Sequence, residues 1–169
     1  MKYALIVIAV IAVAVLVVLI AGWMLPVGHR ATREATYSAT PAEIFGLITD
    51  VEAFPEWRPS VKRVEVLPAV NGHSRFREVG RNGAILYEID TVVPNQRLVG
   101  RIADPSLPFG GKWTYELLPA GSSTTLRITE DGEIYNPIFR FVSRFIIGHT
   151  TTIDQYLGDV GKRLGATSR

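Results

Sequence analysis

Two side chains with acid–base chemistry are predicted to face the interior of the elements that carry them. Glu130 falls on the apolar phase of the alternating segment 124–134. His149 stands four residues from both Phe145 and Ile153, in the middle of an apolar stripe with helical spacing. A carboxylate can orient an imidazole, and a cavity can tune the pKa values of both groups. The pair could act as acid and base on a ligand, or could be a buried polar pair that fixes a helix on a sheet.

The strands that precede Glu130 add an apolar lining to this pair. Their apolar residues fall on alternate positions, so they point to one face of the predicted sheet. That face and the last helix would enclose a cavity. The residues that we predict to bind a ligand there are Tyr87, Ile89, Trp113, Tyr115, Ile128, Glu130, Phe145 and His149.

No pattern in the sequence indicates a metal or cofactor site. The chain has no Cys, and His29, His73 and His149 are too far apart for a cluster with ligand spacing. The glycines Gly80 and Gly83 belong to a hairpin turn, because the spacing and the following helix of a phosphate loop are missing. No Ser stands in a G-x-S-x-G setting. We therefore expect no metal, no cofactor and no nucleophile elbow.

The charge of the chain argues against a nucleic-acid partner. Eighteen Lys and Arg residues against sixteen Asp and Glu residues give a net charge of +2. These charges are spread along the chain without blocks, whereas a nucleic-acid interface needs a clustered basic surface.

Turn residues divide the middle of the chain into short segments. The sequence Thr40-Pro41-Ala42-Glu43 is a capping box with Pro at the first helical position, so a short helix is predicted after a first strand at 33–39. A second short helix is predicted at 50–54. The later strands are predicted at 61–67, 74–79, 84–93, 97–102, 112–118 and 124–134. Their hairpin-length connections favour an antiparallel sheet.

The final segment predicts one long amphipathic helix. Asn136 is its cap, Pro137 lies in its first turn, and apolar residues recur at helical spacing as far as Leu164. A curved sheet wrapped around this helix would bury the apolar faces of both. The predicted fold class is therefore α+β, with a curved antiparallel sheet around a long C-terminal helix.

The N-terminal segment predicts a membrane anchor. Residues 3–25 are uncharged, and as a helix these 23 residues are about 34 Å long, enough to cross a bilayer. A cleaved signal peptide is the alternative, but the apolar run is longer than a signal h-region and bulky residues occupy the −3 positions of the candidate cleavage points. We predict a transmembrane anchor at 1–25, a linker at 26–32 and a folded domain at 33–169.

The charges that flank the anchor do not fix its orientation. Lys2 and the terminal amine balance Arg30 and Arg33 on the other side. A short positively charged tail before a long apolar run is typical of a signal anchor. We therefore expect a single-pass membrane protein whose soluble domain lies outside the cytoplasmic membrane.

Three segments resemble the START-like helix-grip superfamily, also called SRPBCC, which includes polyketide cyclases and lipid-transport domains. They are PAEIFGLITDVEAFPEWRPSVKRVEV, FGGKWTYELLP and ITEDGEIYNPIFRF, within a resemblance that spans about residues 33–164. The resemblance implies a helix-grip fold with a hydrophobic cavity between the sheet and the last helix. It does not imply one function, because members bind or transform unrelated ligands.

These observations leave three functions open. The first is a membrane-anchored binding domain for a lipid or another hydrophobic small molecule. The second is a cyclase or hydrolase that acts on a polyketide-like or aromatic ligand with Glu130 and His149 as acid and base. The third is a partner-binding domain with a filled core. We favour the first, because an anchor holds the domain next to a supply of lipid.

Overall fold

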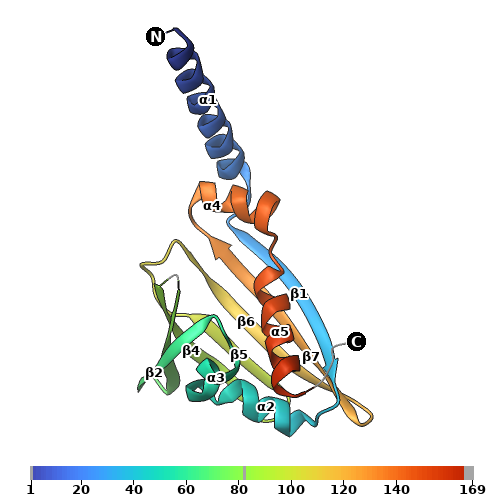
Figure 1. The fold of residues 1–169 in the computed structure, drawn as a ribbon. Coiled ribbons are helices and arrows are strands. Elements are labelled where there is room, and N and C mark those ends of the chain that lie inside the picture. Colours follow the sequence, from blue (N-terminus) through green and yellow to red (C-terminus); the bar gives the residue numbers. More distant parts are fainter. Residues whose placement is uncertain (1, 82, 166–169) are drawn as a thin grey trace.

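Seven antiparallel strands form one curved sheet in the computed structural model, which describes residues 2–81 and 83–165 (Figure 1). The strands are β1 (Gly28–Tyr37), β2 (Val61–Val70), β3 (His73–Gly80), β4 (Gly83–Val93), β5 (Arg97–Ile102), β6 (Phe109–Ala120) and β7 (Ser123–Ile134). Their order is β1-β7-β6-β5-β4-β3-β2, so the first and last strands of the chain pair side by side. The α+β fold class with a curved antiparallel sheet is confirmed.

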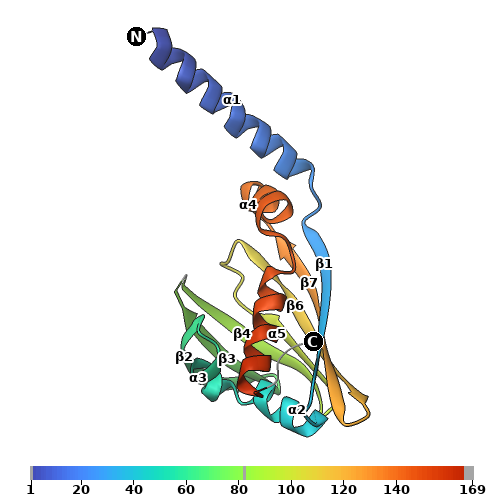
Figure 2. The ribbon, with the colours of Figure 1, turned by 45° about the vertical axis from the view of Figure 1, so that its right-hand side comes forward.

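Helices occupy the concave side and the two ends of this sheet. They are α1 (Lys2–Met24), α2 (Pro41–Thr49), the 3-10 turn η1 (Val51–Ala53), α3 (Phe54–Trp57), α4 (Pro137–Val142), the π-helical turn η2 (Ser143–Ile147) and α5 (Thr151–Arg163). Figure 2 shows α5 along the inner face of the sheet, α2 and α3 at the end of the sheet remote from α1, and α4 at the other end. The curved sheet therefore packs around α5, as expected for a helix-grip fold.

The hydrophobic core lies between the concave face of the sheet and the helices α2, α3 and α5. Ile128 on β7 and Ile153 and Val160 on α5 are fully buried. The Tyr37 hydroxyl donates a hydrogen bond of 2.7 Å to the Leu157 carbonyl, which ties β1 to α5. This packing fixes α5 on the concave face of the sheet.

The capping box predicted before α2 is present. The Thr40 hydroxyl accepts a hydrogen bond from the Glu43 backbone N–H, and the Glu43 carboxylate accepts one from the Thr40 N–H. These reciprocal bonds satisfy backbone donors that a helix start leaves free. They set the start of α2, whose buried Ile44 and Ile48 close one end of the core.

The prediction of one continuous C-terminal helix is wrong. The helix that starts at Asn136 widens into the π-helical turn η2 and stops at Gly148, whose φ of +84° belongs to the left-handed region. A new helix, α5, then begins at Thr151. Because of this break, α4 and η2 lie across the end of the sheet, and α5 alone follows its concave face (Figure 1).

The predicted linker at 26–32 is also wrong over most of its length. Residues 28–32 already belong to β1 and pair with residues 129–133 of β7. On this edge strand most side chains are polar and exposed, but Ala31 is buried and His29 is half-buried. The less exposed positions of β1 thus follow the period of two expected for a strand. Few of them are apolar, so the sequence does not reveal this strand.

The N-terminal helix α1 stands apart from the sheet (Figures 1 and 2). Its 23 residues are long and apolar enough to cross a bilayer, and none of its most apolar stretch is buried in the protein. Its C-terminal end contacts α4: a Cβ at Gly22 would overlap the Pro137 carbonyl. The helix therefore has the features of the predicted anchor.

Candidate functional site

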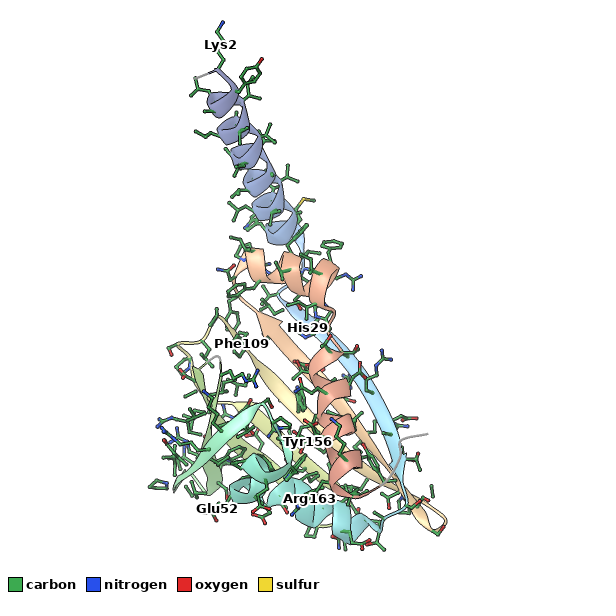
Figure 3. All side chains as sticks on the ribbon, in the orientation of Figure 1. Lys2, His29, Glu52, Phe109, Tyr156 and Arg163 are labelled. Carbon is green, nitrogen blue, oxygen red and sulfur yellow. The ribbon has the colours of Figure 1, made fainter. Side chains whose placement is uncertain are left out.

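A cavity of about 1080 Å³ lies on the concave side of the sheet, lined by residues of the strands, of the α2–α3 region and of the junction between η2 and α5. Its volume reaches the upper end of the range typical of small-molecule sites. Glu52 and His29, both on its wall, lie toward opposite ends of it, as Figure 3 shows. Six residues predicted to bind a ligand line this cavity: Tyr87, Ile89, Trp113, Tyr115, Glu130 and His149.

The other two predicted residues are not among those that line the cavity. Ile128 has the predicted inward orientation, but its side chain is fully buried in the core beneath α5. Phe145 lies on η2 and is 62% exposed, because the helix break at Gly148 removes it from the stripe that packs on the sheet. Ile128 and Phe145 therefore lie outside the cavity wall that the other six residues help to form.

A cluster of titratable groups occupies the cavity end next to η2. The imidazoles of His29 and His149 stack with ring centroids 4.0 Å apart. His29 Nε2 lies 3.8 Å from Glu130 Oε1, and His149 Nδ1 lies 3.1 Å from the Ser143 hydroxyl oxygen. The predicted pair of Glu130 and His149 thus shares one site, with His29 beside both.

His29 was missed because the sequence analysis placed it in a linker. Its signal is the period-two pattern of β1, in which His29, Ala31, Ala35 and Tyr37 are the less exposed positions. The strand partner of His29 is Gly132, and a Cβ there would overlap the imidazole. The lack of a side chain at Gly132 therefore makes room for the His29 ring.

Burial shifts the pKa values of His29, His149 and Glu130 in the direction that favours the neutral form of each side chain. Desolvation and the neighbouring His149 lower the pKa of His29, while desolvation and Arg144 lower the pKa of His149. Desolvation raises the pKa of Glu130, against a hydrogen bond from Trp113 that lowers it. Neutral imidazoles offer one N–H donor and one acceptor each, so the cluster can hydrogen bond a polar group of a ligand or exchange a proton with it.

A second polar site, a partly buried ion pair, lies on the cavity wall farther from α4. The Arg58 guanidinium donates two hydrogen bonds to the Glu78 carboxylate. It also lies over the rings of Phe54 and Tyr156, 4.7 and 5.0 Å from their centroids. Burial by itself lowers the pKa of Arg58, but Glu78 and the nearby tyrosines raise it overall. This pair gives no signal in the sequence, because neither residue interrupts an apolar run.

Aromatic rings separate the two polar sites. Tyr156 of α5 contacts Trp113 and Tyr115 of β6 with centroid distances of 5.8 and 5.7 Å. Figure 3 shows Tyr156 on the side of α5 that faces the sheet. Burial raises the pKa of Tyr115 and of Tyr156, so both hydroxyls stay protonated. The cavity wall is therefore aromatic around Trp113 and Tyr115.

One group of metal-ligating residue types lies close together elsewhere on the sheet. His73, Glu88 and Asp90 bring potential ligand atoms within 4.8 Å of one another. Arg101 already donates hydrogen bonds to both carboxylates, and the His73 Nδ1 lies 3.0 Å from the Ile89 carbonyl oxygen. The two carboxylates are thus paired with Arg101 and Arg75, and we assign no metal to them.

Comparison with known proteins identifies the family of this arrangement. Residues 28–156 match the model of the family described as polyketide cyclase / dehydrase and lipid transport. A search of curated proteins gave no match. The matched segment begins at the first residue of β1 and ends inside α5, so it contains the whole sheet.

Solved structures of low sequence identity share the fold. A START superfamily protein from Mycobacterium smegmatis is 17% identical, with a TM-score of 0.59 over 80% of this chain and 99% of its own. The Zhui aromatase/cyclase from Streptomyces sp. R1128 is 12% identical, with a TM-score of 0.65 over 82% and 94%. A norcoclaurine synthase from Thalictrum flavum is 12% identical, with a TM-score of 0.64 over 82% and 94%. The START-like superfamily is thus confirmed, and the chain belongs to its polyketide cyclase/dehydrase and lipid-transport family.

Proposed function

We propose that this protein is a membrane-anchored domain that binds a lipid or another hydrophobic small molecule. The observation that carries the proposal is the cavity of about 1080 Å³, whose walls are largely aliphatic and aromatic. The long apolar helix α1 supports the membrane part of the proposal. A tether next to a bilayer raises the local concentration of lipid around the domain.

The two polar sites suggest what kind of ligand fits. His29 and His149 can hydrogen bond a hydroxyl or carbonyl group at the end near η2. Arg58, already paired with Glu78, can share a donor with a weakly polar group at the second site. We infer a ligand with an apolar or aromatic body and few polar groups, rather than a densely charged one.

We further propose that residues 1–25 span the membrane and that the folded domain lies outside the cytoplasmic membrane. The short basic tail at Lys2 before the apolar run supports this orientation. A reporter fused after Arg169 that is active on only one side of the membrane tests it. Activity on the cytoplasmic side would contradict the orientation, and a mature protein that begins near Trp23 would contradict the anchor.

The binding test is mass spectrometry of lipids and other small molecules that co-purify with the full chain in detergent. Ile89 lines the cavity, so Ile89→Trp should fill it and reduce the bound ligand. Val93→Trp on the same strand is the control, because Val93 is 38% exposed and is not among the lining residues. Equal ligand content in wild type and Ile89→Trp would contradict binding in this cavity and favour the partner-binding alternative.

A second candidate function is acid–base catalysis on the bound ligand, as in a cyclase or hydrolase. The contacts among Glu130, His29 and His149 favour it. Removing a general acid or base lowers turnover by roughly a hundredfold to ten-thousandfold while binding persists. For a pure binding protein, Glu130→Gln and His149→Gln should change ligand affinity modestly. Conversion of a bound ligand by the wild type, lost in these variants, would establish the enzyme.

A further inference from the structure

The α4–η2 segment (137–147) presents a contiguous apolar surface to solvent. In a water-soluble protein, such large side chains are normally covered unless they form an interaction site. Phe145 is 62% exposed and Ile146 is 71% exposed. The exposed apolar residues of the segment are Ile138, Phe139, Phe145, Ile146 and Ile147.

This surface continues directly from the end of α1. Pro137 approaches Gly22 so closely that a Cβ at Gly22 would overlap its carbonyl. The buried Arg140 guanidinium donates a hydrogen bond of 2.7 Å to the Leu25 carbonyl, just after the last turn of α1. Beside this junction, Trp23 is 74% exposed. The end of α1 and α4 are therefore packed together (Figure 2). The exposed apolar side chains of both elements lie next to this junction.

The inner side of the same segment forms the rim of the cavity. Phe139 and Ile147 both line the cavity, and both are more than half exposed. Val142 and Ser143 lie between them in the lining. A surface that covers the α4–η2 segment would therefore also cover one opening of the cavity.

We propose that the α4–η2 segment is a membrane-docking surface that lies in the headgroup layer of the bilayer which α1 spans. The proposal rests on the membrane attachment in the proposed function. If α1 crosses the hydrocarbon core, Trp23 lies at the interface, and Pro137, in contact with Gly22, must lie at the same depth. A protein partner at this place would have to displace lipid. The exposed Arg144 adds a cation that suits anionic headgroups.

The consequence for function is a route for the ligand. With Phe139 and Ile147 at the membrane surface, the rim of the cavity touches the lipid layer. An apolar molecule can then pass between the bilayer and the cavity without crossing bulk water, where its exposed apolar area is unfavourable. The segment thus joins the anchor to the binding site.

Single cysteines carrying the environment-sensitive fluorophore NBD test this docking in the full chain. The wild type has no Cys, so each introduced thiol is the only labelling site. Ile146→Cys reports the surface, and Ser122→Cys in the exposed turn between β6 and β7 is the control. The protein is reconstituted in vesicles of phosphatidylcholine and phosphatidylglycerol that contain doxyl-labelled lipid. We expect a shorter emission wavelength and strong quenching at position 146, with neither effect at position 122.

A third labelled position distinguishes the docking of the α4–η2 segment from the membrane anchoring by α1. Val13→Cys lies in the middle of α1, where Val13 is 60% exposed, and deep doxyl labels should quench it if α1 spans the bilayer. Quenching at 13 with no quenching at 146 would overturn the docking surface and leave the anchor standing. Quenching at 146 alone would show that the segment contacts lipid, but it would overturn the anchor and with it the proposed position of the segment beside a spanning α1. Quenching at neither position would overturn both.

Discussion

The imidazole of His29 at the start of β1 stacks on that of His149, the residue that follows the helix break at Gly148. These residues are separated by most of the chain, and they join the edge strand to the junction between η2 and α5. Burial lowers the pKa of each ring below its usual value. Two neutral rings can stack, whereas two protonated rings this close repel each other.

The first prediction is a loss of stability on acidification that depends on this stack. Below about pH 6.5 both histidines become protonated in the unfolded chain. In the folded chain their lowered pKa values keep them neutral to a lower pH, so the unfolding free energy falls as the pH falls through this window. Glu130 acts in the opposite direction, because its raised pKa lets the folded state take up a proton first. Thermal melts between about pH 8 and about pH 5.5 should show a smaller decline for His149→Gln than for wild type. His73→Gln, outside the cluster, should decline as wild type does; equal slopes for all three proteins would contradict the prediction.

The second prediction concerns the space that Gly132 leaves for His29. A Cβ at Gly132 would overlap the His29 ring, so Gly132→Ala should displace the ring and cost about 1 to 3 kcal/mol of unfolding free energy. Gly28 on the partner strand is the control, since its added Cβ would find its nearest atom at 3.9 Å. Denaturant unfolding measures both, and the same small effect at both positions would mean that His29 is not held against Gly132.

Sequence periodicity predicts the sheet and two of the three titratable residues of the cluster, Glu130 and His149, for identifiable reasons. Glu130 interrupts a strongly apolar strand phase, so its inward orientation was visible. His29 lies on an edge strand with few apolar residues, and there the pattern was too weak to separate a strand from a linker. The position of His29 also depends on Gly132 of the neighbouring strand β7, which leaves room for the imidazole. Sequence spacing does not reveal such long-range pairs.

The helix break could not be read from glycine content. Gly148 adopts a φ of +84° and ends the π-helical turn, whereas Gly158 and Gly161 lie inside α5 as ordinary helical residues. The same residue type therefore stops one helix and is tolerated in another. The tertiary contacts of the two helices differ: α5 packs on the sheet, while α4 packs on the end of α1. Because of this difference in packing, Phe145 lies on the surface and not on the predicted cavity wall.

The third prediction follows from this corrected position of Phe145. Because the side chain is 62% exposed, Phe145→Ala should change the unfolding free energy by less than about 0.5 kcal/mol in detergent. Ile153→Ala, at a fully buried position of α5, should cost about 2 to 5 kcal/mol. Chemical unfolding of the two variants compares them directly. A large loss at Phe145 would instead support the continuous helix that the sequence suggested.

The fourth prediction tests the partly buried ion pair between Arg58 and Glu78 in the cavity wall. Arg58→Met leaves the partly buried Glu78 carboxylate without its partner and should cost about 1 to 3 kcal/mol of unfolding free energy. Adding Glu78→Leu removes that charge too, so the double variant should recover much of the loss. Arg63→Met breaks the exposed pair with Glu65 and should cost at most about 1 kcal/mol. A double variant as unstable as Arg58→Met alone would mean that the packing of the arginine, not its charge pairing, carries the effect.

The last prediction separates the cavity from the core by adding volume to each. Ile89→Trp places the larger ring at the cavity wall, where empty space can accept it, so the melting temperature should stay near that of wild type while uptake of a fluorescent lipid falls. Ile128→Trp forces the same ring into a fully buried position beneath α5 and should cost about 1 to 3 kcal/mol or more through strain. The two residues were predicted to play one role, and only the placement of α5 over the β1–β7 side of the sheet distinguishes them. Thermal melts and lipid titrations of both variants make the comparison. Equal destabilisation by the two substitutions would show that the space beside Ile89 is filled, and the binding function would then lose its cavity.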